Sequence, residues 1–126
     1  MTRYVDTNVL VRIMTNDVPE LTQTAIQEVK NSKLGELIIL DAVLVELFFV
    51  LEFNKNYKFP RDKIEIVFNG ILAIPQFKIS HDAKTAFSIY ARHAELDFTD
   101  CLLISSAKGR KKSAFSFDND LNKILN

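Results

Sequence analysis

The chain has 126 residues, 48% of them hydrophobic and 25% charged, and its 16 Lys and Arg balance its 16 Asp and Glu to a formal net charge of zero. This length suits one domain, and this composition is that of a folded protein and excludes a disordered chain. Cys101 is the only cysteine, which excludes a disulfide-stabilised scaffold and favours a reducing compartment. The zero charge argues on its face against a strongly basic nucleic-acid binder.

No targeting or membrane segment is predicted. The first residues lack the apolar stretch of a signal peptide. The most apolar stretch, Leu37 to Leu51, is interrupted by Asp41 and Glu46 and is too short to span a bilayer. We therefore expect a cytoplasmic protein without membrane contact.

The predicted elements alternate between strands and helices along the chain. In the first half they are a strand at Arg3 to Asp6, a helix at Asn8 to Thr15, a helix from Pro19 to about Lys33, a strand at Leu37 to Leu40 and a helix from Ala42 to about Asn54. In the second half they are a helix opened by Pro60, a strand at Phe77 to Ser80, a helix through Ala83 to Ala94, a helix from Phe98 to about Lys108, a strand at Ser113 to Phe117 and a short helix at Leu121 to Leu125. This order predicts an α/β fold with a parallel sheet.

Residue types at the predicted helix ends indicate caps. Asp41 is expected to be the N-cap of the third helix, and Ser80 or Asp82 that of the helix beginning near Ala83. Gly109 is the expected C-cap of the helix that begins at Phe98.

Carboxylates follow several of the predicted strands. In open parallel sheets, ligands bind at the carboxyl ends of the strands. Asp6 ends the first strand, Asp118 follows the last, Asp97 and Asp100 open a helix, and Glu46 lies in the helix after the second strand. Separate segments could thus deliver acids to one edge of the sheet.

Glu46 is the least ordinary of these acids. Its neighbours in sequence are almost all apolar, which is typical of a buried helix, and a buried carboxylate needs a partner or a metal ion. The alternative is a helix whose single solvent-facing stripe includes Glu46.

The other acids also have ordinary structural interpretations. Asp6 could form an Asx-turn or cap a helix. Asp97 and Asp100 have the spacing of a capping box, and the segment Asp118 to Asp120 could be a polar turn that caps the last helix. Each site is weak evidence alone, and their conjunction indicates a metal centre of Mg²⁺ or Mn²⁺, which prefer oxygen ligands.

Other chemistries lack their residues. Zinc is not expected, because Cys101 is solitary and His81 and His93 lack ligand spacing. There is no glycine-rich phosphate loop and no G-x-S-x-G nucleophile motif.

Four segments resemble the acidic motifs of PIN-domain ribonucleases: Asp6 to Arg12, Val45 to Leu51 around Glu46, Asp97 to Ile104, and Ser116 to Asp120. The resemblance covers essentially the whole chain as a single domain, and its compact length resembles the VapC-type toxins of toxin–antitoxin pairs. It implies a three-layer α/β/α sandwich with a central parallel sheet.

The resemblance also implies roles for residues. Asp6, Glu46, Asp100 and Asp118 would be the catalytic, metal-binding acids, with Asp97 beside them. Supporting roles would fall to Thr7 and Asn8, which orient the first acid, to Ser116, which orients the last, and to Asp120, which lies at the edge of the site or caps the last helix. The cofactor would be Mg²⁺, with Mn²⁺ as a substitute. Hydrolysis of RNA would leave a 5′-phosphate and a 3′-hydroxyl.

A toxin would also have an antitoxin partner and would be expected to form a homodimer. The alternatives are a stand-alone PIN nuclease in RNA processing, a receiver-like domain, and a PIN-like fold that only binds a partner. A receiver domain usually has an adjacent acidic pair after its first strand, whereas Asp6 is followed by Thr7 and Asn8.

Two features of charge bear on an RNA substrate. If Asp6, Glu46, Asp97, Asp100 and Asp118 form one site, 11 acids remain against 16 Lys and Arg, so the rest of the chain carries a formal +5. The run from Lys108 to Lys112 is the densest basic segment, and it could either complement a helix end or steer phosphates.

Overall fold

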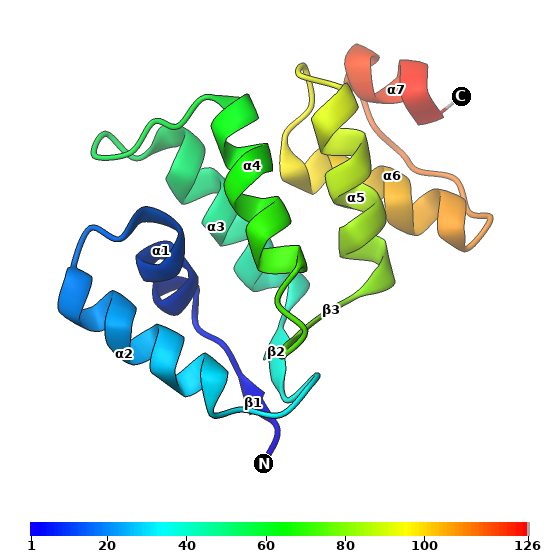
Figure 1. Cartoon of the computed structure of the whole chain (residues 1–126). Coiled ribbons are helices and arrows are strands. Elements are labelled where there is room, and N and C mark those ends of the chain that lie inside the picture. Colours follow the sequence, from blue (N-terminus) through cyan, green and yellow to red (C-terminus); the bar gives the residue numbers. More distant parts are fainter. Residues whose placement is uncertain (126) are drawn as a thin grey trace. The chain divides into compact units, whose positions relative to one another are not determined.

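The computed structural model describes residues 1–125, and within them the chain forms two compact units. Unit 1 comprises Met1–Ile79 and unit 2 comprises Ser80–Asn126. Figure 1 shows the elements of unit 1 from blue to green and those of unit 2 from yellow-green to red.

Unit 1 is built on a three-stranded parallel sheet. Its strands are β1 (Arg3–Tyr4), β2 (Leu37–Ile39) and β3 (Phe77–Ile79), in the order β1-β2-β3. The register pairs Arg3 with Leu37, and Leu37 in turn with Phe77. The crossovers are helical: α1 (Thr7–Thr15) and α2 (Pro19–Lys30), then α3 (Asp41–Phe53) and α4 (Arg61–Leu72), as Figure 1 shows. The predicted α/β class with a parallel sheet is confirmed.

The core of unit 1 centres on α3, which packs against α1 and α4. Leu44, Leu47 and Leu51 have helical spacing along one face of α3 and are fully buried. The ring of Phe48 meets that of Phe68 on α4 edge to face, with centroids 5.0 Å apart. These contacts hold the helix that carries Glu46 in a defined position.

Two predictions about α3 are wrong. Asp41 is the first residue of the helix, and Leu40, whose backbone is extended, occupies the N-cap position. Glu46 is exposed, because α3 turns a stripe of Ala42, Glu46, Phe49 and Phe53 to solvent. Phe49 and Phe53 are 63% and 58% exposed, so an apolar composition does not mean burial on every side here. The solvent-facing stripe, which the sequence left open as the alternative, is the one the structure adopts.

Unit 2 contains the helices α5 (His81–Arg92), α6 (Phe98–Gly109) and α7 (Asn119–Leu125). Ser80 caps α5, since its hydroxyl accepts a hydrogen bond from the backbone N–H of Ala83 at 3.1 Å. The side chain of Ser105 on α6 donates to the carbonyl of Asp82 at 2.8 Å. The helices α5 and α6 pack against each other and cross in the view of Figure 1.

Two further predictions fail in unit 2. The segment 113–117 forms no strand, because a strand requires ladder hydrogen bonds and this segment makes none with the described residues. Gly109 is not the C-cap of α6. It is the last helical residue, Arg110 follows as C-cap, and Lys111 takes the left-handed conformation with φ of 54°.

Asp82 joins the two long helices of unit 2. Its Oδ2 accepts hydrogen bonds from Arg110 at 2.7 Å and from Ser106 at 3.2 Å. These bonds, led by that from Arg110, hold the pKa of the Asp82 carboxyl below its usual value. A lowered pKa in the folded state contributes stability above the usual pKa, and this contribution is lost as the pH falls through the folded value.

We expect Asp82→Asn to lower the free energy of unfolding at pH 7 by about 1 kcal/mol, a small value because the Arg110 side chain is 61% exposed and screened by solvent. Thermal unfolding between pH 7 and pH 3 measures the effect. The difference from wild type should shrink below about pH 4. Glu65→Gln on α4 is the control, and a difference that stays constant with pH would contradict the assignment.

Candidate functional site

Asp6 stands where β1 passes into α1. The backbone N–H of Val5 still bonds to Ile38 of β2 at 2.9 Å, and Asp6 then has an extended conformation before α1 begins at Thr7. The side chain of Asp6 accepts no capping hydrogen bond. Asp6 therefore occupies the N-cap position of α1, as one of its structural interpretations predicted, but its carboxylate does not bond to the helix. The carboxylate is exposed, so its oxygens can accept a ligand.

Thr7 connects α1 to Glu46. Its hydroxyl donates a hydrogen bond to Glu46 Oε2 at 3.0 Å, and Thr7 itself is only 3% exposed. The sequence assigned Thr7 to the orientation of Asp6. No local signal could have revealed the true partner, because the two residues are 39 positions apart and meet only when α3 packs against α1.

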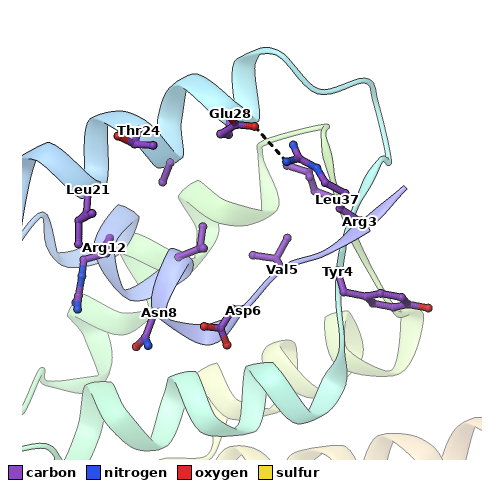
Figure 2. A pocket seen from close by; sticks show the side chains of 12 residues that line it. Arg3, Tyr4, Val5, Asp6, Asn8, Arg12, Leu21, Thr24, Glu28 and Leu37 are labelled. Carbon is purple, nitrogen blue, oxygen red and sulfur yellow. Dashed lines mark hydrogen bonds and ion pairs between the residues drawn. The ribbon is translucent and has the colours of Figure 1, made fainter. Parts of the chain in front are cut away.

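A pocket of about 540 Å³ lies in unit 1, and Asp6 is one of its lining residues. Most of the other lining residues come from β1, α1, α2 and β2. Figure 2 shows Asp6 and Asn8 next to one another at one side of it, and the ion pair of Arg3 with Glu28 at another. Most of its remaining lining is aliphatic, including Val5, Val9, Leu21 and Leu37. The pocket thus combines an aliphatic lining with polar side chains, which include Arg12 and Thr24.

Asp97 and Asp100 form a reciprocal capping box at the start of α6. The N–H of Asp100 donates to Asp97 Oδ1 at 2.8 Å, and the N–H of Asp97 donates to Asp100 Oδ2 at 3.3 Å. The ordinary structural interpretation of this pair is thus correct. It does not exclude a second role, because each carboxylate has another oxygen that the capping box does not use.

Electrostatics in unit 2 make Asp100 unusual. Partial burial, and then the negative charges of Asp97 and Asp118, raise the pKa of the Asp100 carboxyl above its usual value. Clustered carboxylates have this effect when no cation offsets them. These acids of unit 2 therefore hold negative charge that a divalent cation would neutralise.

Asp118 caps the last helix. Its Oδ1 accepts from the N–H groups of Asp120 at 2.8 Å and Leu121 at 3.2 Å. The hydroxyl of Ser116 accepts from the backbone N–H of Asp118 at 2.9 Å. Ser116 and Asp120 thus both contact Asp118. The hydroxyl of Ser116 bonds to the backbone N–H of Asp118, and the backbone N–H of Asp120 bonds to the carboxylate of Asp118.

The structure divides the predicted acids between the two units. Asp6 and Glu46 lie on neighbouring elements of unit 1, and Asp97, Asp100 and Asp118 lie in unit 2. Among the described residues of the chain, no group of three or more His, Cys, Asp or Glu side chains is placed to hold a metal ion. The donor chemistry nevertheless suits Mg²⁺ or Mn²⁺, because every candidate ligand is a carboxylate oxygen.

The contact between Thr7 and Glu46 can be tested directly. If the chain cleaves RNA, as the resemblance implies, we expect Thr7→Val, which keeps the shape but removes the donor, to lower that cleavage by about tenfold, because an unheld Glu46 samples several rotamers. The free energy of unfolding should fall by about 1–2 kcal/mol. Thr85→Val, at an exposed position of α5, is the matched control. Wild-type cleavage by Thr7→Val would show that this hydrogen bond does not serve catalysis.

Comparison with known proteins adds one positive finding. Residues 3–125 match the family described as the PIN domain, and the predicted three-layer α/β/α architecture agrees with that match. No curated protein and no solved structure matches the chain at a significant level. Within residues 1–125, no helix combines the length and apolar character needed to cross a membrane.

Proposed function

The chain belongs to the PIN domain family, and on that premise we propose that it is a metal-dependent endoribonuclease. PIN domains are in general nucleases, so a nucleic-acid substrate and phosphodiester hydrolysis follow from the family. The observation that carries the more specific proposal is the acidic start of α6, where partial burial and then the negative charges of Asp97 and Asp118 raise the pKa of Asp100. A site with excess negative charge is suited to a divalent cation and a phosphate substrate.

Five carboxylates are proposed as metal ligands: Asp6 and Glu46 in unit 1, and Asp97, Asp100 and Asp118 in unit 2. A divalent cation bound by them supplies charge neutralisation at the attacked phosphate and lowers the pKa of a coordinated water. Asp6 offers an exposed carboxylate directly after a strand that pairs with β2, so its backbone is held by the sheet. Asp97 and Asp100 are held by the capping box, which fixes the direction of both side chains.

Thr7 and Ser116 would position the acids without binding the metal themselves. Thr7 holds one oxygen of Glu46 and leaves the other available to a ligand. Ser116 fixes the backbone of Asp118, whose Oδ1 is engaged by the N–H groups of α7 and whose Oδ2 remains available. Single-stranded RNA is the proposed substrate, because its unpaired backbone can enter a shallow acidic edge.

The nuclease proposal is tested by incubating the purified chain with labelled single-stranded RNA, single-stranded DNA and duplex RNA in Mg²⁺. We expect internal cleavage of single-stranded RNA with 5′-phosphate and 3′-hydroxyl ends. Exclusive trimming from one end, or equal cleavage of DNA, would contradict the assignment as an endoribonuclease.

We also propose a toxin role, in the cytoplasm, as a homodimer neutralised by an antitoxin protein. It rests on the resemblance of the acidic motifs of the chain to those of PIN-domain ribonucleases. Induced expression should arrest growth, and co-expression of the product of an adjacent small gene should relieve it. Growth that continues under induction of an active nuclease would favour the second candidate, a stand-alone PIN nuclease in RNA processing.

A further inference from the structure

A dense group of cations lies at the carboxyl end of α6, far along the chain from the acids at its start. We call Lys108, Arg110, Lys111 and Lys112 the basic turn. They are four of the seven Lys and Arg residues in unit 2, and all four side chains are exposed. Of the four, only Arg110 has a role described above, as the C-cap of α6 and the partner of Asp82.

The backbone of the basic turn is tightly defined. The N–H of Lys112 bonds to the carbonyl of Ala107 at 2.8 Å, and that of Lys111 to the carbonyl of Lys108 at 3.2 Å. This is the Schellman arrangement, which places Lys111 in the left-handed region with φ of 54°. Glycine is the usual residue at that position, because a side chain there is strained. The chain therefore keeps a lysine where a glycine would be more stable.

One cation of the basic turn anchors it and three do not. Arg110 donates to Asp82 at 2.7 Å, which ties the turn to the start of α5. Within the described part of the chain, no ion pair engages Lys108, Lys111 or Lys112. Three ammonium groups thus face solvent on a backbone held by hydrogen bonds and an ion pair.

Complementing the helix dipole explains only part of this charge. Cations are favoured in the last turn of a helix, which accounts for Lys108. Lys111 and Lys112 lie beyond the helix, where the dipole effect declines steeply. Together with Asp82 the group carries a formal charge of +3, against about −0.5 for the end of a helix dipole. A net positive surface remains.

We propose that the basic turn binds backbone phosphates of the single-stranded RNA substrate at a distance from the cut site. This inference rests on the proposed nuclease function and names where its substrate is held. Because α6 has twelve residues, its two ends are about 18 Å apart. One strand of a stacked duplex advances about 3.4 Å per nucleotide, so about five nucleotides of stacked RNA, or fewer of extended RNA, would span the acids at the start of α6 and the basic turn.

RNA suits this surface better than an acidic peptide. Peptide recognition generally adds apolar pockets or a free sheet edge to charge. The segment 108–113 contains no apolar side chain, so it offers charge alone. Regularly spaced phosphates match such a surface without further contacts.

The test measures binding without cleavage. A fluorescein-labelled 20-nucleotide oligouridine is titrated with the full chain in EDTA, and anisotropy is followed at several salt concentrations. For the triple variant Lys108→Gln, Lys111→Gln and Lys112→Gln, we expect affinity at least about tenfold weaker at 0.1 M salt. The slope of log K against log salt should decrease in magnitude by about 2.

The matched control removes three exposed lysines elsewhere with the same change in net charge: Lys33→Gln, Lys55→Gln and Lys58→Gln. Lys58 is also left-handed, with φ of 42°, so the control includes a comparable backbone position. Equal loss in both triple variants, or no loss in either, overturns the proposal. A 20-residue polyglutamate that competes as well as the RNA overturns the assignment to nucleic acid.

A single substitution separates binding from stability. Lys111→Gly removes both the charge and the strain, so we expect a higher unfolding midpoint together with about fivefold weaker RNA binding at 0.1 M salt. Wild-type affinity in this variant overturns the role of Lys111.

Cleavage assays distinguish the two possible failures. If the nuclease proposal fails, RNA binding in EDTA still depends on the basic turn and no cleavage is seen in Mg²⁺. If only the proposal for the basic turn is wrong, cleavage occurs and the KM of the triple variant equals that of the control variant. If both proposals are correct, the triple variant has a raised KM and an unchanged kcat.

Discussion

Substituting Asn for Asp100 is expected to reduce metal-dependent RNA cleavage by at least about a hundredfold, since loss of a metal ligand should exceed the effect of a residue that only supports one. Asn keeps the size of the side chain and an oxygen that can accept the N–H of Asp97, so the capping box can persist. Single-turnover cleavage of labelled RNA in Mg²⁺ measures the loss.

The loss should not arise from unfolding. Because the folded state raises the pKa of Asp100, the ionised carboxylate destabilises the fold at pH values above that pKa. Asp100→Asn removes this cost, and its unfolding midpoint at pH 7 should equal or exceed that of wild type.

Asp6→Asn in unit 1 should lose cleavage to a similar extent, and Glu95→Gln is the control. Wild-type rates in both Asn variants would refute the acidic site.

Removal of divalent metal is expected to reduce cleavage to background. Carboxylates alone cannot neutralise the charge that develops on the attacked phosphate, so excess EDTA should abolish product formation and excess Mg²⁺ or Mn²⁺ should restore it. Cleavage that persists in EDTA would contradict the metal-dependent proposal.

A second measurement separates metal binding from catalysis. A cation that binds only the folded chain raises the unfolding midpoint with increasing concentration. We expect this shift in wild type and in Glu95→Gln, and a much smaller shift in Asp100→Asn. An equal shift in all three proteins would place the bound cation elsewhere.

Helix positions were the most predictable part of the fold. The start at Pro19, the cap at Ser80 and the capping box at Asp97 follow from local chemistry between residues close in sequence, and the structure contains all three. Local chemistry also misled where two arrangements were feasible. Asp41 has the residue type of an N-cap, yet the extended backbone of Leu40 starts the helix one residue earlier. At the end of α6, Gly109 stays helical and Lys111 adopts the left-handed conformation.

The sequence named candidate site residues, and it did not predict their contacts. Asp6, Glu46, Asp97, Asp100 and Asp118 were found from their positions after strands and at helix starts, and they stand as proposals. The partner of Thr7 was assigned wrongly, because a side-chain hydrogen bond depends on how two helices pack.

The sequence by itself determined the α/β class, because strand and helix periodicity are local properties, and its motifs indicated the family. The acidic residues that it singled out stand as proposals. The tertiary structure decided which side of α3 faces solvent, and thereby that Glu46 is exposed and held by Thr7. It also decided that Asp100 lies within reach of the charges of Asp97 and Asp118, and that the basic turn is anchored by Asp82. Burial, pKa and ion pairing depend on residues distant in sequence, and packing alone brings those residues together.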